Sequence, residues 1–160
     1  MPTPAYIRQL RSKIGHDLLL LPTVTAIILD DSGHVLLHRR TEDSHWAIPG
    51  GILEPGEEPA EAVIREVREE TGLIIAPERI TGIYGGPENM GTYPNGDQFA
   101  MVNITFACKV IGGELDATGE ETSQLSYFPP EALPSSLFEK HRVRIAHALM
   151  EEPPYFKLPD

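Results

Sequence analysis

The chain has 160 residues, 41% of them hydrophobic and 23% charged, which fits one domain spanning 1–160 with its own core. Its 24 acidic and 13 basic side chains give a formal net charge of -11. This charge argues against a nucleic-acid polymer as partner, because such binding gains affinity from Lys and Arg replacing counterions. A small anionic substrate stays compatible if a cation mediates the contact.

The single cysteine and the apolar stretches indicate in which cellular compartment the protein is expected. Cys108 alternates with Ile104, Phe106 and Val110, which predicts a small core residue and excludes a disulfide framework. The first 15 residues lack the apolar run of a secretory signal. The longest apolar stretch, 18–29, is interrupted by proline and is too short to span a bilayer. We therefore expect a cytoplasmic protein without membrane contact.

The N-terminal third predicts a helix and then a β-hairpin. Residues 4–14 have proline near the first turn and apolar residues at helical spacing, which indicates a helical extension over 1–17. Two runs rich in β-branched residues, 23–30 and 35–40, flank turn residues and predict paired strands. A short strand is expected at 46–48.

The clearest helix signal in the chain runs from Pro59 to Glu70. Proline suits the first helical position, no helix breaker follows it, and Gly72 suits the position just past the end. The apolar side chains of this segment fall on one face, which we expect to pack against a sheet.

The C-terminal half predicts further strands and one more helix. The strands are expected at 73–76, 80–84, 98–111, 114–116 and 127–128. The segment 85–96 predicts a long exposed loop, either a substrate lid or an ordinary turn region. A C-terminal helix within 135–150 precedes a Pro-rich tail, 151–160, that we expect to be loose. The element order predicts an α+β fold, an α/β/α sandwich, and the two terminal helices leave open whether the chain forms a homodimer.

Seven glutamates lie between residues 54 and 70. Glu66 and Glu70 are four residues apart on the predicted helix, with Glu69 beside them at the border of the apolar face. Like charges at this spacing destabilise a helix by roughly 0.2–0.5 kcal/mol per pair, so the group calls for a compensating cation. Oxygen ligands without a cysteine or a histidine pair indicate Mg²⁺, with Mn²⁺ as the alternative. The competing interpretation is a solvated acidic helix face.

The surrounding pattern favours the metal interpretation. Gly51, Glu57 and the run Arg65-Glu66-Val67-Arg68-Glu69-Glu70-Thr71-Gly72-Leu73 match every fixed position of the Nudix box, a loop–helix–loop signature. The chain therefore resembles the Nudix hydrolases over roughly residues 20–135. The resemblance implies the Nudix fold, a central mixed sheet flanked by helices.

The resemblance also implies roles for single residues. Glu66, Glu69 and Glu70 would hold the metal together with the Gly50 carbonyl. The candidate catalytic residues are Arg65, Glu69, Glu70 and Glu121. Glu69 or Glu121 would act as the base, with Glu120 as a neighbouring alternative to Glu121. Arg65 and Glu57 would form an ion pair that fixes the loop to the helix, behind the metal ligands.

Four residues are candidate substrate contacts. Arg39 and Arg40 end a predicted strand near the site and could meet a phosphate, with a solvated strand end as the alternative. Trp46 could stack on a base, with core packing as the alternative. Tyr93 lies in the predicted long loop.

The resemblance implies metal-dependent hydrolysis of a pyrophosphate bond in a nucleoside diphosphate linked to another moiety. ADP-ribose or another nucleotide sugar is slightly favoured by the polar loop. One alternative is a (deoxy)nucleoside triphosphate, including oxidised nucleotides. The other is a non-catalytic nucleotide-sensing Nudix domain.

Overall fold

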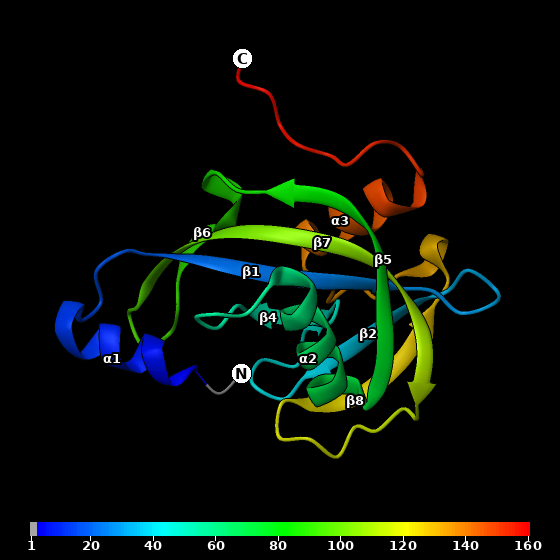
Figure 1. Ribbon diagram of the computed structural model, residues 1–160, viewed down its shortest axis with the longest axis horizontal. Coiled ribbons are helices and arrows are strands. Elements are labelled where there is room, and N and C mark those ends of the chain that lie inside the picture. Colours follow the sequence, from blue (N-terminus) through cyan, green and yellow to red (C-terminus); the bar gives the residue numbers. More distant parts are fainter. Residues whose placement is uncertain (1–2) are drawn as a thin grey trace.

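Two β-sheets, three α-helices and two short 3₁₀ helices make up residues 3–160, the part of the chain that the computed structural model describes (Figure 1). The α-helices are α1 (Ala5–Ile14), α2 (Pro59–Thr71) and α3 (Glu139–Leu149), and the 3₁₀ helices are η1 (Pro87–Asn89) and η2 (Pro130–Ala132). The strands are β1 (Leu19–Ile28), β2 (Val35–Arg40), β3 (Trp46–Ala47), β4 (Gly50–Ile52), β5 (Leu73–Tyr84), β6 (Met90–Thr92), β7 (Gln98–Gly113) and β8 (Thr122–Phe128).

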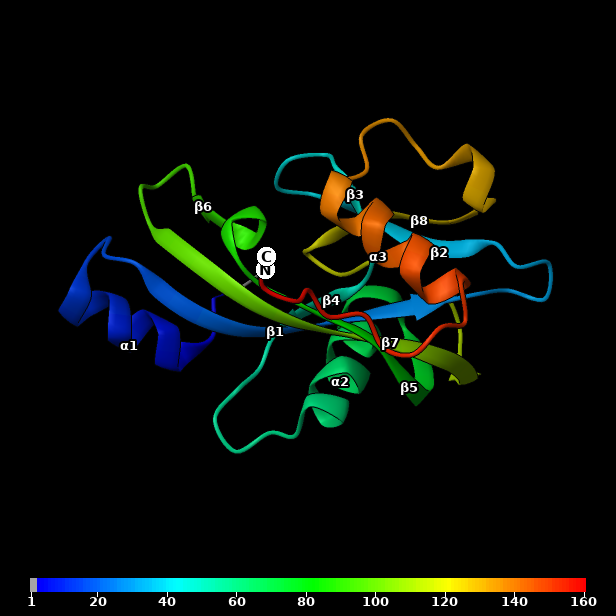
Figure 2. The same ribbon diagram turned by 90° about the horizontal axis from the view of Figure 1, so that it is seen from above.

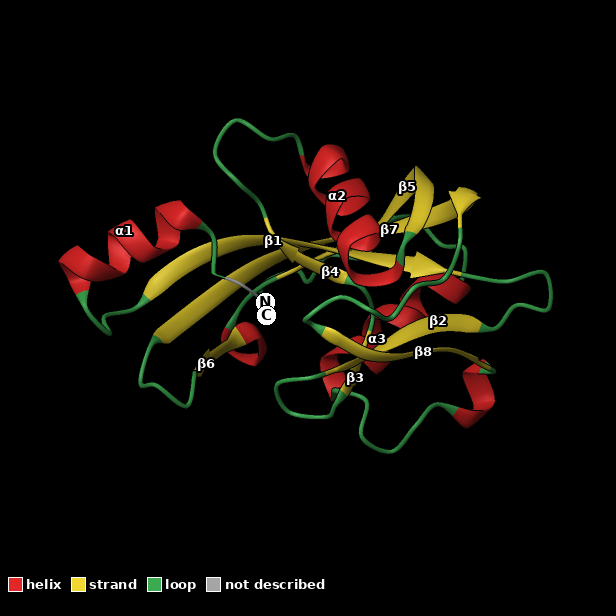
Figure 3. Ribbon diagram, turned by 90° about the horizontal axis from the view of Figure 1, so that it is seen from below, coloured by secondary structure: helices red, strands yellow, loops and turns green. Residues whose placement is uncertain are grey.

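The larger sheet has the strand order β4-β1-β7-β5, with β6 beside the first part of β7. β1 and β7 run parallel, while the other pairs in this sheet are antiparallel. The smaller sheet, β3-β2-β8, is antiparallel throughout. Helices α2 and α3 lie on opposite sides of the larger sheet (Figures 2 and 3). A mixed sheet between helices confirms the predicted α+β class.

Apolar clusters on both sides of the larger sheet hold these layers together. The first joins α2 to the sheet through Val63 and Val67, which are fully buried against Val24 and Ala26 of β1. The second joins α3 to β2 and β3. The third holds α1, whose Ile7 packs with Leu21 and Ile52. Among the described helices, none is long and apolar enough to cross a bilayer.

The predicted hairpin between 23–30 and 35–40 is wrong. The turn itself forms, but β1 and β2 enter different sheets and share only an isolated bridge between Leu29 and Val35. β7 pairs with β1 from Leu19 to Ile28, and β4 occupies Thr23 to Thr25 on the opposite edge. β2 therefore pairs with β3 and β8 instead.

Two expectations in the second half also need correction. The strands predicted at 73–76 and 80–84 are one strand, β5, whose register against β7 shifts at three places. Residues 114–116 form no strand, because the Asp116 amide donates to the Thr71 carbonyl at the end of α2. The predicted loop 85–96 contains η1 and β6, and it buries Asn89.

The C-terminal tail was predicted to be loose, and part of it is held. The Tyr155 carbonyl accepts a hydrogen bond from the Ile83 amide at 2.8 Å, and the Tyr155 amide donates to the Thr81 carbonyl at 2.9 Å. The Tyr155 ring stacks on His147 of α3 with centroids 4.0 Å apart. These contacts cover the outer edge of β5, beyond which the last residues project away from the body (Figure 1).

Candidate active site

Helix α2 carries the glutamates and is fixed at both ends by its own sequence. Glu58 caps the N-terminus, and its side chain and that of Glu61 exchange hydrogen bonds with each other's backbone, while Pro59 occupies the first turn. Gly72 ends the helix in the left-handed conformation, with φ of 77°. The predicted helix is confirmed, and burying its apolar face leaves Glu66 and Glu70 at the edge of the packed surface.

Two glycines let the start of β4 lie against these carboxylates. The Gly50 amide donates a hydrogen bond of 2.9 Å to Glu70 Oε2. A Cβ placed on Gly51 would lie 2.3 Å from the Glu66 carboxyl carbon, closer than any side chain allows. Only a residue without a side chain fits here, so the two glycines let backbone and carboxylates share one small space.

Burial raises the pKa of both carboxyls. Glu66 and Glu70 are each only 4% exposed. Burial lifts the pKa of Glu66 to about 7, against the opposing hydrogen bond from Arg65. The pKa of Glu70 is raised by burial first and by the charge of Glu66 second. Two adjacent buried anions are thus incompletely compensated by protein groups, which is the situation that a bound cation relieves.

Arg65 ties the loop to the helix. Its Nε and Nη2 donate to the two oxygens of Glu57 at 2.7 and 3.0 Å, and its Nη2 also donates to the Ile52 carbonyl at 3.2 Å. Its Nη1 donates to Glu66 Oε1 at 2.8 Å and to Glu69 Oε2 at 3.4 Å. The hydrogen bond from Arg65 lowers the pKa of Glu57. The guanidinium therefore anchors the loop and partly neutralises Glu66.

Glu121 approaches the cluster from the segment that leads into β8. Burial raises the pKa of Glu121, and the charge of Glu69 adds to the effect. Glu121 in turn raises the pKa of Glu66 and of Glu70. The Thr41 amide donates to the Glu121 carbonyl at 3.1 Å, which fixes this segment to the end of β2. The neighbouring Glu120 side chain is exposed.

Within residues 3–160, no three His, Cys, Asp or Glu side chains are preassembled as a metal site. The reason lies in their present partners. Glu69 is largely exposed and, like Glu66, faces Arg65, while Glu70 is engaged by the Gly50 amide. The donor set nevertheless fits a hard divalent cation, because it offers buried carboxylate oxygens of raised pKa beside a backbone turn.

Sequence reasoning gave His38 no role, and the structure places it beside the cluster. His38 Nε2 lies 3.8 Å from Glu70 Oε2, and Nδ1 lies 3.1 Å from the Thr122 hydroxyl. Burial lowers the pKa of His38 to about 4, so the ring is neutral at pH 7. Its position in the predicted strand 35–40, close to the predicted site, was the only signal in the sequence.

The candidate substrate contacts separate into two groups. Trp46 is buried and packs edge-on against Phe128 at 4.9 Å, so it belongs to the core and we drop it as a substrate contact. Arg39 is exposed, and Arg40 is half-buried beside Glu42 at 2.8 Å. Tyr93 is half-buried, with its ring 4.5 Å from that of Phe99.

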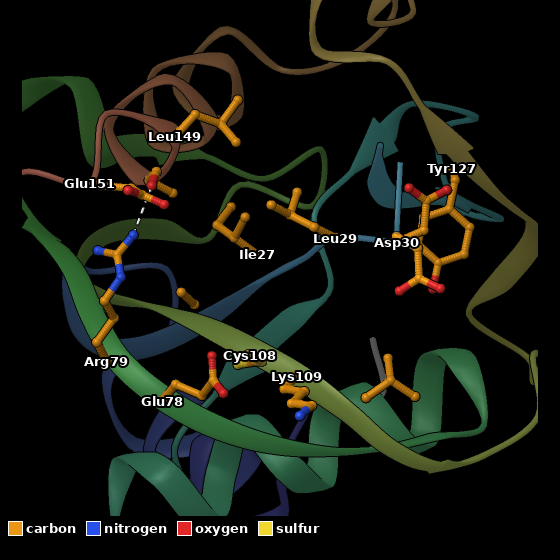
Figure 4. Close-up of a pocket in the computed structure, with 14 residues that line it drawn as sticks. Ile27, Leu29, Asp30, Glu78, Arg79, Cys108, Lys109, Tyr127, Leu149 and Glu151 are labelled. Atoms are coloured by element: carbon orange, nitrogen blue, oxygen red, sulfur yellow. Dashed lines mark hydrogen bonds between the residues drawn. The ribbon is translucent and has the colours of Figure 1, made fainter. Parts of the chain in front are cut away.

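A cavity of about 540 Å³ lies elsewhere, between β5, β7 and the end of α3 (Figure 4). Arg79 crosses it and donates to the Ala148 carbonyl at 2.8 Å. Cys108 lines it, and burial raises the pKa of this thiol to about 12, in keeping with an unreactive core residue. The cavity shares no residue with the glutamate cluster. A shallower hollow along the outer face of α2 does include Arg65 and Glu69.

Comparison with known proteins finds relatives of this chain in both sequence and structure. The family model of the NUDIX domain matches residues 19–149. An ADP-ribose pyrophosphatase of Methanocaldococcus jannaschii is 35% identical over 122 residues, which cover 75% of this chain and 68% of the relative. A putative 8-oxo-dGTP diphosphatase of Bacillus subtilis is 34% identical over 108 residues, 68% of this chain and 66% of the relative. The crystal structure of a UDP-X diphosphatase superposes with a TM-score of 0.69 at 25% identity, covering 91% of this chain and 68% of the other.

Proposed function

The chain belongs to the Nudix hydrolase family, and from this premise we propose that it hydrolyses the pyrophosphate bond of a nucleoside diphosphate linked to another moiety, with Mg²⁺ as cofactor. ADP-ribose or a related nucleotide sugar is the proposed substrate. A relative named for ADP-ribose and a structural neighbour named for UDP-linked compounds support this class.

One observation carries the proposal: Glu66 and Glu70 are buried side by side against Gly50 and Gly51 at the start of β4. A merely solvated acidic helix would keep these side chains in water, where their pKa stays near its usual range. Burying two carboxylates without full compensation costs stability, and a bound cation offsets that cost for the ionised pair.

The proposed roles follow from this geometry. Glu66, Glu69, Glu70 and the Gly50 carbonyl would hold Mg²⁺. Bound there, the ion would neutralise the phosphates and lower the pKa of a water molecule. Glu121 or Glu69 accepts the proton of the attacking water, whose oxygen bonds to phosphorus as the bridging P–O bond breaks.

Arg65 and Glu57 are proposed to act on the metal site indirectly, by positioning its ligands. Their ion pair keeps Glu66 and the loop in place, so that the carboxylates need little rearrangement when substrate arrives. We also treat 1–160 as one domain, because α1 packs on the larger sheet through Ile7.

A second candidate is a (deoxy)nucleoside triphosphate, including oxidised forms. It is favoured by the relative named 8-oxo-dGTP diphosphatase. A non-catalytic nucleotide sensor is less well supported, because all four glutamates of the Nudix box (57, 66, 69 and 70) are present.

The test is a substrate panel. ADP-ribose, UDP-glucose, dGTP and 8-oxo-dGTP are incubated with the protein, with and without Mg²⁺, and products are separated by ion-exchange chromatography. We expect Mg²⁺-dependent cleavage, fastest for a nucleotide sugar. If the triphosphates are cleaved at least tenfold faster than the nucleotide sugars, the second candidate is correct. If nucleotides bind but none of them is cleaved, the protein is a sensor.

A further inference from the structure

Basic side chains gather at the N-terminal end of α3, although the chain as a whole is acidic. Lys140 Nζ lies 6.0 Å from the centroid of the Phe138 ring, and the Arg40 guanidinium lies 5.6 Å from the same centroid. Arg144 is one turn further along α3, on the same face as Lys140. We call Arg40, Lys140 and Arg144 the α3 basic cluster.

Two members of this cluster lack a carboxylate partner. Within residues 3–160, no Asp or Glu lies at ion-pair distance from Lys140 or Arg144, whereas Arg40 pairs with Glu42. In a chain with almost twice as many acids as bases, it is unexpected that the half-buried Lys140 and the buried Arg144 both lack an acidic partner. They carry an energetic cost that an anion would offset.

Arg144 is the more deeply buried of the two cations that lack an acidic partner. It is 3% exposed, its Nη2 donates to Asn89 Oδ1 at 2.9 Å, and its guanidinium lies 5.3 Å above the Tyr84 ring. Its Nε is buried and has no hydrogen-bond partner among the described residues. Burial lowers the pKa of Arg144 to about 10, so it remains a cation at pH 7.

The start of α3 adds a second attraction for anions. Phe138, at the N-cap, provides no side-chain hydrogen bond to the first turn. The free amides of a helix N-terminus favour negative charge. Lys140 Nζ lies over the Phe138 ring at the N-cap, while the Arg144 guanidinium contacts Asn89 and the Tyr84 ring.

The α3 basic cluster adjoins the candidate active site. His141 Nδ1 accepts a hydrogen bond of 3.0 Å from the Ile48 amide, two residues before Gly50. Burial raises the pKa of Glu121 and of Tyr93, and in each case the nearby Arg40 charge opposes the rise. The N-terminal end of α3 lies beside β3, on the side of the larger sheet that faces away from α2 (Figure 2).

We propose that Lys140, Arg144 and Arg40 form a second phosphate-binding subsite, which holds a phosphate oxyanion of the substrate on the side of the site opposite α2. The subsite rests on the proposed function, since its natural ligand is a phosphate of the same nucleotide. It would place the diphosphate between the carboxylates of α2 and the amino end of α3. A purely structural cluster would bind no anion.

Binding of inorganic pyrophosphate without any metal tests the subsite directly. The full chain, with EDTA and at low ionic strength, is titrated by calorimetry. We expect wild-type binding that weakens about tenfold in Lys140→Ala and is largely restored in Lys140→Arg, as loss of one charge-assisted contact requires. Alanine is a good helix former, so the variant folds, which a thermal melt checks.

Lys109→Ala is the matched control, because Lys109 is an exposed lysine of β7 beside the remote cavity. Equal affinity in Lys140→Ala and Lys109→Ala, or no binding by the wild type, overturns the subsite. In turnover assays, Lys140→Ala should raise KM about tenfold with kcat within twofold of wild type.

The two proposals fail separately. Glu70→Gln should keep metal-free pyrophosphate binding while losing turnover. A wild-type protein that binds pyrophosphate through Lys140 but cleaves nothing in the panel would refute the hydrolase and leave the subsite standing.

Discussion

The Gly50 amide and the Glu70 carboxylate are joined by a hydrogen bond of 2.9 Å across twenty residues of sequence. The bond fixes the start of β4 to the last turn of α2, and within residues 3–160 it is the only contact of the Glu70 side chain at normal hydrogen-bond distance. One amide cannot fully compensate a buried carboxylate, which is why burial still raises the pKa of Glu70.

Glu70→Gln should therefore separate activity from stability. We expect turnover to fall by at least about a thousandfold, as when a group that stabilises developing charge is removed. The amide oxygen can still accept from Gly50, and position 70 no longer carries a buried charge, so the melting temperature without metal should be equal or higher. Thermal melts with and without Mg²⁺ measure both effects, and the Mg²⁺-induced rise in melting temperature should vanish.

The control for this variant is Glu78→Gln, an exposed glutamate of β5. It should behave as wild type in turnover and in both melts. If Glu70→Gln retains wild-type turnover, Glu70 does not hold the catalytic metal.

Gly51→Ala should damage the site through one methyl group. The added Cβ would meet the Glu66 carboxylate at 2.3 Å, so either the turn or the side chain must move. Overpacking of this kind costs about 1–3 kcal/mol of unfolding free energy, and we expect weaker Mg²⁺ binding with it. Urea denaturation and metal titration measure the two losses.

Gly112→Ala serves as the comparison, because its Cβ would make ordinary contacts of 3.7 Å and longer with Ile74. It should change stability by less than the Gly51 variant and leave metal binding unaltered. Equal losses in the two variants would mean that the turn tolerates a side chain and that the close approach to Glu66 is unimportant.

The pH dependence of stability should report on Glu66. Its pKa is raised from 4.5 to about 7 on folding, so the folded state holds a proton that the unfolded state has lost. Stability conferred by the neutral form is present below pH 4.5 and is lost as the pH rises to 7, by up to about 3 kcal/mol. Mg²⁺ should abolish this loss, because it stabilises the ionised form.

His38 requires a differential measurement. Its pKa is lowered to about 4, so it makes stability rise over the same pH range, with the opposite sign. The informative quantity is the unfolding free energy of wild type minus that of Glu66→Gln, from urea melts between pH 4.5 and 7.5. A difference that stays constant with pH would show that Glu66 is ionised throughout.

Local signals made much of the candidate site predictable. The Pro59 start, the Gly72 end and the spacing of the glutamates lie within one short segment, and the structure forms that helix as expected. The ion pair between Glu57 and Arg65 spans only eight residues and is likewise formed. Periodicity and end signals suffice where every interacting group is close in sequence.

Contacts between distant segments were not predictable in this way. Turn residues at 30–33 indicate a hairpin, but the partners of β1 come from β4 and from β7, some eighty residues away. Lys140 and Arg144 read as ordinary surface cations of an amphipathic helix. Their isolation from carboxylates becomes visible only once Asn89 and Phe138 are placed around them.

Arg65→Lys should show that geometry, not charge alone, holds the loop. A lysine keeps the positive charge but cannot make two parallel hydrogen bonds to Glu57 while also reaching Glu66. We expect a loss of about 1–3 kcal/mol in unfolding free energy and a lower kcat. Arg68→Lys, an exposed position on the same helix, is the control and should change neither. If Arg65→Lys keeps the wild-type kcat, then Arg65 contributes only its positive charge and not its hydrogen-bond geometry.

Removing the tail should uncover the edge of β5. Deletion of 151–160 removes two backbone hydrogen bonds at Tyr155 and its stacking on His147 and Tyr84. We expect a loss of roughly 1–3 kcal/mol in unfolding free energy, from about 1 kcal/mol for each hydrogen bond and aromatic pair with partial cancellation by chain entropy. Exposed backbone at the strand edge should also increase self-association, seen by light scattering.

Deletion of 157–160 alone removes only exposed residues and should leave stability and scattering unchanged. Identical melts for the two deletions would mean that Tyr155 contributes nothing to the sheet.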